Sequence, residues 1–353
     1  MSAQPEAKPP SGLTYPWERT VPAPGETIKV ADGILWVRMP MPMRLDHINV
    51  WLIEDGEGWT LVDTGLSTAP THDYWRSIFK NTLRGKPITR VYVTHLHPDH
   101  IGNAGWITEL FDCMLWMSRT DYLLCRAMAT DTGRDAPMEG VNFFKAAGLT
   151  DAQLRTYREK FGSFGANIFR LPQSYRRVVD REVIRIGAHD WTVIVGRGHA
   201  PEHACLWCPA LNVFISGDQL LPRISSNVSV FPTEPFANPL DDWLSSCRML
   251  KDLLPAETLV LPAHNEPFIG GPTRLANLIR EHETGLAALL ELCRTPKRAV
   301  DVFDVLFKSK ITDGVVMMAT TESLAHLNYL IARGDMTRTT DADGVSWYQA
   351  RAA

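Results

Sequence analysis

"THLHPDHIGN", residues 94–103, concentrates histidine and aspartate side chains in one short stretch. It places His95, His97, Asp99 and His100 side by side. Polar side chains are costly to bury unless something satisfies them. A polar surface loop that happens to be rich in histidine is the plain interpretation, and a metal site is the alternative. The rest of the chain has to decide between the two.

Composition describes an ordinary globular protein. The chain has 353 residues, of which 45% are hydrophobic and 22% charged, enough for one large domain or a domain with an appendage. Its net charge of −4 gives no general attraction to nucleic acid or to an anionic membrane. No apolar run reaches the length of a transmembrane helix. Because residues 1–26 are polar and proline-rich, without the apolar core of a signal peptide, we expect an N-terminal arm and a cytoplasmic protein.

The cysteines predict neither a disulfide framework nor a zinc ribbon. There are only six, and the single C-x-x-C pair, Cys205 and Cys208, lacks the second pair that a ribbon needs. In an extended segment these two side chains point to opposite faces. They are therefore expected to be core thiols of one strand.

Apolar periodicity predicts an α/β fold with two similar halves. Single strands are expected at 33–40, 47–55, 58–65, 88–95 and 257–264, more than one strand within 183–199, and two strands within 203–218. Helices are expected at 67–83 and from Asn103 or Gly102 to 111, and residues 112–180 look helical throughout. The domain prediction is an arm at 1–26, a catalytic domain at 27–271 with the helical insert 112–180, and a C-terminal domain at 272–353. That last domain should contain helices at 273–293, 298–307 and 321–334 and a hairpin at 335–350, which suggests a small winged-helix module.

Ligand-type side chains recur where the predicted strands end. The full set is Asp63, His95, His97, Asp99, His100, His199, Asp218 and His264. Histidines two apart on an extended segment point the same way, and the aspartate and histidine that follow can face a neighbouring position. One short motif can therefore supply two adjacent metal ions. His199 can complete the first site and His264 the second, with Asp218 placed to bridge them.

At this point the sequence strongly resembles the metallo-β-lactamase-fold hydrolase superfamily. The motifs "LVDTG", "THLHPDH", "GHAPEH", "SGDQ" and "LPAH" occur in the family's order over about residues 30–270. The resemblance implies a four-layer αβ/βα sandwich with a dinuclear centre along one edge. The C-terminal helices and hairpin resemble the winged-helix-like tail of one branch, which includes an endoribonuclease and thioesterases of secondary metabolism.

The resemblance also implies roles for individual residues. The first metal is held by His95, His97 and His199, the second by Asp99, His100 and His264, and Asp218 bridges them. Asp63 orients ligands from behind, and His203 makes a structural hydrogen bond. Glu202 replaces the usual glycine. Zinc is the default metal, with iron or manganese as alternatives. A hydroxide bridging the metals is the implied nucleophile, and Asp99 both binds metal and orients that water.

Two function classes follow, and the superfamily name does not choose between them. The first is hydrolysis of a small acyl substrate, a thioester first and a lactone or ester second; glyoxalase II activity falls within it. Leu221 stands where acyl-homoserine-lactone hydrolases carry a tyrosine, and Asp218 stands where true β-lactamases use cysteine, serine or histidine. The second is a nuclease whose C-terminal domain grips nucleic acid. A non-catalytic binding protein on the same fold is a distant third.

Charge favours the small-molecule class. Residues 272–353 contain ten Lys/Arg and ten Asp/Glu, without the basic face that nucleic-acid binding requires. That segment is expected to serve packing or a homodimer contact. The substrate pocket is expected between the insert 112–180 and residues 220–235, which offer an apolar lining. Arg223 is a candidate for holding one anionic group, with a solvated arginine as the alternative.

Overall fold

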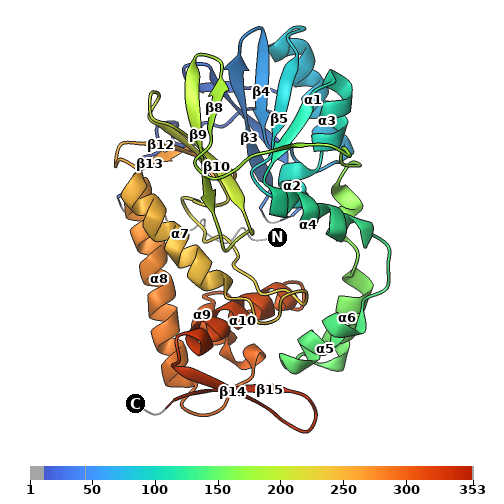
Figure 1. Cartoon of the computed structure of the whole chain (residues 1–353), viewed down its shortest axis with the longest axis vertical. Coiled ribbons are helices and arrows are strands. Elements are labelled where there is room, and N and C mark those ends of the chain that lie inside the picture. Colours follow the sequence, from blue (N-terminus) through green and yellow to red (C-terminus); the bar gives the residue numbers. More distant parts are fainter. Residues whose placement is uncertain (1–11, 44, 352–353) are drawn as a thin grey trace.

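The chain folds into two β-sheets packed face to face, with helices covering both outer faces (Figure 1). The structure is a computed structural model that describes residues 12–43 and 45–351. The first sheet follows the strand order β1 (Ile28–Ala31), β2 (Ile34–Pro40), β3 (His47–Asp55), β4 (Gly58–Val62), β5 (Ile88–Tyr92), β6 (Met114–Met117) and β7 (Arg176–Arg177). The second follows β13 (Phe268–Ile269), β12 (Leu259–Pro262), β11 (Val213–Gly217), β10 (His203–Cys208), β9 (His189–Gly196) and β8 (Val183–Ile186).

The buried side chains form three apolar cores, and side chains that alternate along a strand contribute to different cores. In β3, Val50 and Leu52 face the helices while Trp51 and Ile53 face the second sheet, because successive side chains of a strand point to opposite faces. Cys205 and Cys208 divide in the same way, since Cys205 packs in the helix-side core of the second sheet and Cys208 between the sheets. The predicted αβ/βα sandwich is therefore confirmed.

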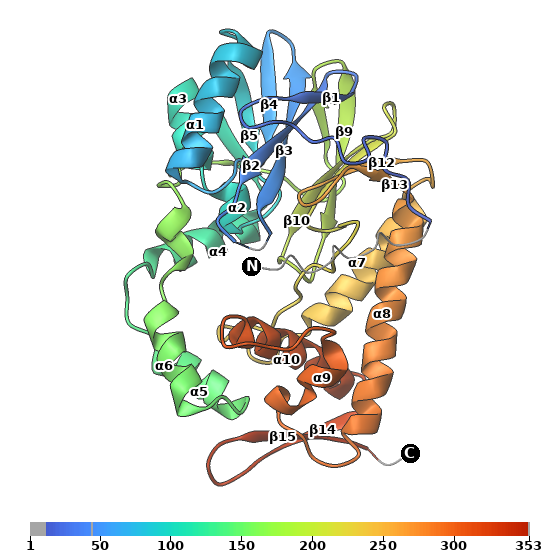
Figure 2. The ribbon, with the colours of Figure 1, turned by 180° about the vertical axis from the view of Figure 1, so that it is seen from behind.

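Helices cover the two outer faces and extend beyond the sheets. Those near the first sheet are α1 (Ala69–Ile78) with the π-helical turn η1 (Phe79–Leu83), α2 (Pro98–Ile101), α3 (Ala104–Phe111) and α4 (Arg119–Thr130). A helical arm continues through α5 (Met138–Ala146), α6 (Asp151–Lys160) and the 3-10 turn η2 (Phe164–Asn167). On the other side lie α7 (Pro239–Leu253) and α8 (Gly271–Leu292). Figure 2 shows α5 and α6 on the opposite side of the molecule from α8.

The segment 112–180 is helical only in part, which corrects the prediction. Residues 114–117 form β6, which pairs in parallel with β5, and residues 176–177 form β7, which pairs in parallel with β6. A short apolar run such as "MLWM" cannot be assigned to strand or helix by periodicity alone. Pairing with the neighbouring strands β5 and β7 decided the outcome, and the guanidinium groups of Arg90 and Arg176 both lie over the Trp116 ring.

The C-terminal segment packs on the core of the second sheet. It contains η3 (Ala299–Val302), α9 (Phe303–Leu306), α10 (Val316–Ala332) and the hairpin β14 (Met336–Thr340) and β15 (Ser346–Ala350). One core joins Phe214 of β11, Leu250 of α7, Leu327 of α10 and Tyr348 of β15. The helix predicted at 298–307 is a 3-10 turn followed by a single α-helical turn.

The N-terminal residues that the structure describes lie along the sandwich. Thr14 pairs with Ile269 of β13, and Trp17 and Val21 pack on the core between the sheets. The first part of the predicted arm, residues 1–11, lies outside the described residues. Within 12–43 and 45–351, no helix combines the length and the apolar character needed to cross a membrane.

Candidate metal centre

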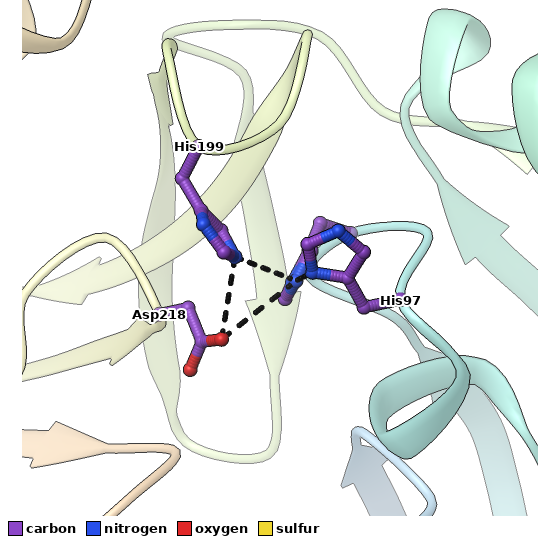
Figure 3. A group of neighbouring side chains, drawn as sticks. His97, His199 and Asp218 are labelled. Atoms are coloured by element: carbon purple, nitrogen blue, oxygen red, sulfur yellow. Dashed lines mark hydrogen bonds and ion pairs between the residues drawn. The ribbon is translucent and has the colours of Figure 1, made fainter. Parts of the chain in front are cut away.

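The ligand-type residues named from the sequence gather at one edge of the sandwich, where strands of both sheets end. From the first sheet, the loop after β5 carries His95 and His97, and Asp99 and His100 lie in α2, which begins at Pro98. The second sheet contributes residues that follow its strands β9, β11 and β12: His199, Asp218 and His264. Figure 3 shows His97, His199 and Asp218 pointing toward one another from separate segments.

One group of side chains consists of His95, His97, His199 and Asp218. The Nε2 atom of His95 lies 2.8 Å from Nδ1 of His97 and 3.3 Å from Nε2 of His199. Asp218 Oδ2 lies 3.3 Å from the same His199 nitrogen. Their ligand atoms all lie within 4.8 Å of one another, which is the spacing of atoms that could share one metal ion.

A second group consists of Asp99, His100 and His264, and Asp218 borders it as well. Asp99 Oδ2 lies 3.4 Å from Nε2 of His264 and 3.6 Å from Nε2 of His100. Asp218 Oδ1 lies 3.3 Å from Nε2 of His264, and Asp218 Oδ2, which faces the first group, also lies 3.5 Å from Nε2 of His100. The Asp218 carboxylate therefore lies between the two groups.

Two buried atoms in this cluster lack a hydrogen-bond partner among the residues that the structure describes. They are Nε2 of His100 and Oδ1 of Asp218. A buried polar atom without a partner costs about 1–3 kcal/mol, so such atoms call for an explanation. A cation between them would satisfy both. Imidazole nitrogens and carboxylate oxygens are also the donor set that zinc, iron and manganese accept. The residues present therefore fit a pair of divalent metal ions.

The protonation of the histidines differs between the two groups. Burial lowers the pKa of His95 well below its ordinary range and that of His97 to about 3, so both rings are neutral, as ligands must be. Burial acts in the same direction on His264, but the carboxylates of Asp218 and Asp99 outweigh it and raise its pKa to about 10. The pKa of His100 is likewise raised, by Asp63, Asp99 and Asp218 against its burial. In the metal-free protein, protons on these two rings therefore balance the carboxylates.

Three of the histidines have Nδ1 held by a contact on the side of the ring away from the cluster. Nδ1 of His100 lies 2.8 Å from Oδ2 of Asp63. Nδ1 of His199 donates to the backbone carbonyl oxygen of Asn227 at 2.7 Å, and Nδ1 of His264 donates to that of His47 at 2.8 Å. With Nδ1 engaged, each ring presents Nε2 to the cluster, which is the arrangement that fixes metal-binding histidines.

Asp63 and His203 lie directly behind the cluster. Asp63 follows β4 with a left-handed φ of 61° and accepts hydrogen bonds from the Thr94 backbone N–H, at 2.8 Å, and from the Thr94 hydroxyl. His203 is buried, and its Nε2 accepts the Asp218 backbone N–H at 3.0 Å. A Cβ at Gly217 would lie 2.5 Å from the His203 ring, so only glycine fits beside it.

Asp121, which the sequence analysis missed, ties the two ligand loops together. This buried residue of α4 accepts the backbone N–H of Leu96 at 3.1 Å and that of Glu202 at 2.8 Å. The Glu202 carboxylate in turn accepts the backbone N–H of Thr120, at the start of α4, at 3.0 Å. Glu202 thus joins the loop after β9 to the helix. A lone aspartate in a first helical turn carries no sequence signal that distinguishes it from an ordinary helix-end acid.

Arg223 lies in an ion pair. Its Nε donates to Oε2 of Glu266 at 3.0 Å, and its guanidinium stacks over the Tyr15 ring. The side chain is mostly buried, unlike the solvated arginine that was the alternative. Its role toward an anionic substrate stays a prediction.

Comparisons with known proteins agree with this architecture. The family model of the Metallo-beta-lactamase superfamily matches residues 43–264, and the model of the Metallo-beta-lactamase-like C-terminal domain matches residues 286–351. A solved structure of a beta-lactamase domain protein from Burkholderia ambifaria is 38% identical, with a TM-score of 0.87 over 96% of this chain and 97% of that one.

Among curated relatives, the probable metallo-hydrolase YqjP of Bacillus subtilis is 23% identical over 87% of this chain and 94% of its own length. The human acyl-coenzyme A thioesterase MBLAC2 is 24% identical over 70% of this chain and 83% of its own. The family model covers strands β3 to β12, from both sheets, and every residue of the cluster. The chain therefore belongs to the metallo-beta-lactamase superfamily and is one of its hydrolases.

Proposed function

We propose that this hydrolase is a dinuclear-metal thioesterase for small acyl substrates, with lactones or esters as weaker substrates. The observation that carries the proposal is the double cluster around Asp218, whose carboxylate lies within 3.5 Å of histidine nitrogens from both groups of ligand atoms. A second support is the human relative that is named as an acyl-coenzyme A thioesterase.

In this proposal the cluster holds two divalent metal ions. His95, His97 and His199 would hold the first ion, and Asp99, His100 and His264 would hold the second. Asp218 would contribute to both, since its carboxylate lies between the two groups. Zinc suits this donor set best, and iron or manganese is the alternative. When bound, such a pair lowers the pKa of a water molecule toward about 7 and polarises the substrate carbonyl.

Asp99 is the residue proposed to orient the attacking water. Burial opposes ionisation, but His100 and His264 lower the pKa of Asp99 to about 2, so the carboxylate is charged at neutral pH. One oxygen faces the two histidines, and the other is left to accept a hydrogen bond from the water. Attack at the acyl carbon breaks the carbon–sulfur bond and yields a carboxylic acid and a thiol, so no nucleophilic side chain is required.

The segments expected to line the substrate pocket support an apolar acyl group. Leu123 of α4, Met138 of α5, and Ile224 and Phe231 of the 220–235 segment are all exposed large apolar side chains. Residues 112–180 contain ten Lys/Arg and eight Asp/Glu, which is too balanced to attract a polyanion. Small-molecule pockets are mostly apolar, with few polar groups.

A substrate panel on the metal-loaded enzyme tests the proposal. It contains acyl-CoA and glutathione thioesters, a lactone, an aryl ester, a cephalosporin, bis-p-nitrophenyl phosphate and single-stranded RNA. The thioesters should give the highest kcat/KM, and His97→Ala should remove that turnover. Efficient turnover of the two phosphodiesters alone would contradict the proposal and support a nuclease.

A further inference from the structure

Residues 226–230 connect the metal centre to the C-terminal helix α10. On the side of the centre, the backbone carbonyl oxygen of Asn227 accepts the Nδ1–H of His199 at 2.7 Å. The hydroxyl of Ser226 donates to the backbone carbonyl oxygen of Asp218. One short segment therefore orients the ring of one candidate ligand and holds the backbone of another.

Helix α10 holds the opposite side of this segment. Asn227 Nδ2 donates to Oε2 of Glu322 at 2.7 Å, and the Val230 N–H donates to the carbonyl oxygen of Thr321 at 3.1 Å. The hydroxyls of Ser229 and Thr321 lie 2.9 Å apart, and Ser229 also donates to Oδ1 of Asn227. Both ends of the Asn227 side-chain amide are therefore engaged, and these contacts restrain the residue whose backbone carbonyl accepts from His199.

The helical turn that carries Glu322 is itself anchored. Its backbone carbonyl oxygen accepts Nδ1–H of His326 at 2.9 Å, and His326 Nε2 lies 3.1 Å from Nδ1 of His282 on α8. Both rings are buried between the two helices. These histidines belong to no motif, yet they extend one continuous chain of polar contacts from α8 to His199.

We propose that Glu322 and Thr321 are positioning residues of the metal centre. Acting through Asn227, they hold the His199 ring so that its Nε2 faces the group formed by His95 and His97. Partners behind a metal-binding histidine fix its ring and raise metal affinity, and removing one typically costs about 10–100-fold. The inference rests on the ligand role of His199 in the proposed function, and it gives the C-terminal segment a part in the chemistry.

Two variants at Glu322 test the inference. Glu322→Leu removes the acceptor of Asn227 at similar size, whereas Glu322→Gln keeps an oxygen for it. Competition with a chromogenic chelator measures zinc affinity, and the visible spectrum of the cobalt-loaded protein reports ligand geometry. For Leu we expect about 10-fold weaker binding of one metal, the lower end of the range because Glu322 acts through Asn227, together with an altered spectrum. The Gln variant should restore both.

Asn328→Leu is the matched control on the same helix. Asn328 donates to the carbonyl oxygens of Pro235 and Ala237, so it holds a later part of the same connection and not residues 226–230. This variant should lose thermal stability and keep its metal affinity and cobalt spectrum. Unchanged metal binding in Glu322→Leu, or equal weakening in Asn328→Leu, would overturn the inference.

Should Glu322→Leu fail to fold, Thr321→Val removes the hydroxyl, which contacts Ser229 and also donates to the carbonyl oxygen of Met318 within α10, and it keeps the backbone acceptor of Val230. A smaller loss of affinity in the same direction is then expected, and no loss would count against the inference. Metal binding by the parent protein distinguishes a failure of the proposed function from a failure of the positioning role. A parent that binds no metal contradicts the proposed function, whereas a parent that binds metal, with variants identical to it, contradicts only the positioning role.

Discussion

The two halves of the candidate metal centre are built in different ways. The first-sheet half, residues 95–100, is contiguous and comes from the end of β5 and the single turn of α2. The second-sheet half is assembled from the ends of three strands, which carry His199, Asp218 and His264. Local backbone geometry places the first half. The second exists only because β9, β11 and β12 end at the same edge of one sheet.

The halves also differ in what supports them. In the first, the carboxylate of Asp63 orients His100. In the second, the backbone carbonyls of Asn227 and His47 orient His199 and His264. A carboxylate can be removed by one substitution, whereas a carbonyl is present whatever the side chain. The second half is therefore sensitive to whatever moves the backbone.

Removing one histidine from either half should have the greatest effect on activity, and it tests whether the two halves act as one centre. His97→Ala and His199→Ala come from different halves but should each lose the same metal, leaving about one of two, with activity down by more than about 100-fold. Metal analysis and kinetics check this, and chelation of the parent should abolish turnover. His189→Ala, a histidine of β9 outside the cluster, should keep both metals. Full activity in a metal-free preparation would refute the prediction.

Asp99→Asn tests, within the contiguous half, whether Asp99 is needed for catalysis and not only for metal binding. The amide keeps the size of the side chain but orients a nucleophilic water poorly, so kcat should fall by about 10²–10⁴-fold, the range for a positioned acid or base. Steady-state kinetics on protein shown to retain both metals is the measurement. A near-normal kcat with both metals bound would mean that another group orients the water.

Asp121 joins the two halves. Its titration should make the free energy of unfolding depend on pH. Burial raises the pKa of Asp121 to about 6, although hydrogen bonds from Glu202 and Leu96 favour the carboxylate. The folded state therefore binds this proton more tightly than the unfolded state. The protonated Asp121 therefore makes its full contribution to the free energy of unfolding below about pH 4. This contribution is lost as the pH rises through about 6, and the loss is roughly 3 kcal/mol at most.

Asp121→Asn cannot titrate at this position. The free energy of unfolding of the metal-free parent, minus that of the variant, should fall between about pH 4 and pH 7. Urea unfolding of both proteins across this range gives the difference. A difference that stays constant with pH would show that the buried carboxyl does not titrate in this window.

The smallest effect is expected at Glu202, the second link between the halves. Its carboxylate lies at the N-terminal end of α4, where a negative charge is worth about 0.3–1 kcal/mol. Glu202→Ala should lower the free energy of unfolding by that amount and leave metal content and kcat unchanged. A marked loss of metal would mean that Glu202 holds the loop of His199 and is more than a helix-end charge.

Much of the fold and the site could be predicted because both have local signatures. A short apolar run bounded by polar turns marked strands such as β3, and a histidine-rich turn after β5 marked the candidate ligand loop. The predicted ligand residues come together in the structure. The assignment of residues 114–117 to a helix was wrong, because only pairing with β5 makes this short apolar run a strand.

The amino-acid sequence was enough to identify the candidate ligand side chains and the main strands, since side-chain type and spacing can be read from it directly. What holds these side chains in place depends on how distant segments pack together. Asp121 bonds backbone N–H groups of two loops distant in sequence, and Glu322 reaches His199 through Asn227. Such contacts depend on backbone groups that every residue carries and on segments brought together by packing. No local pattern distinguishes them, so they become visible only when the sheets and α10 are in place.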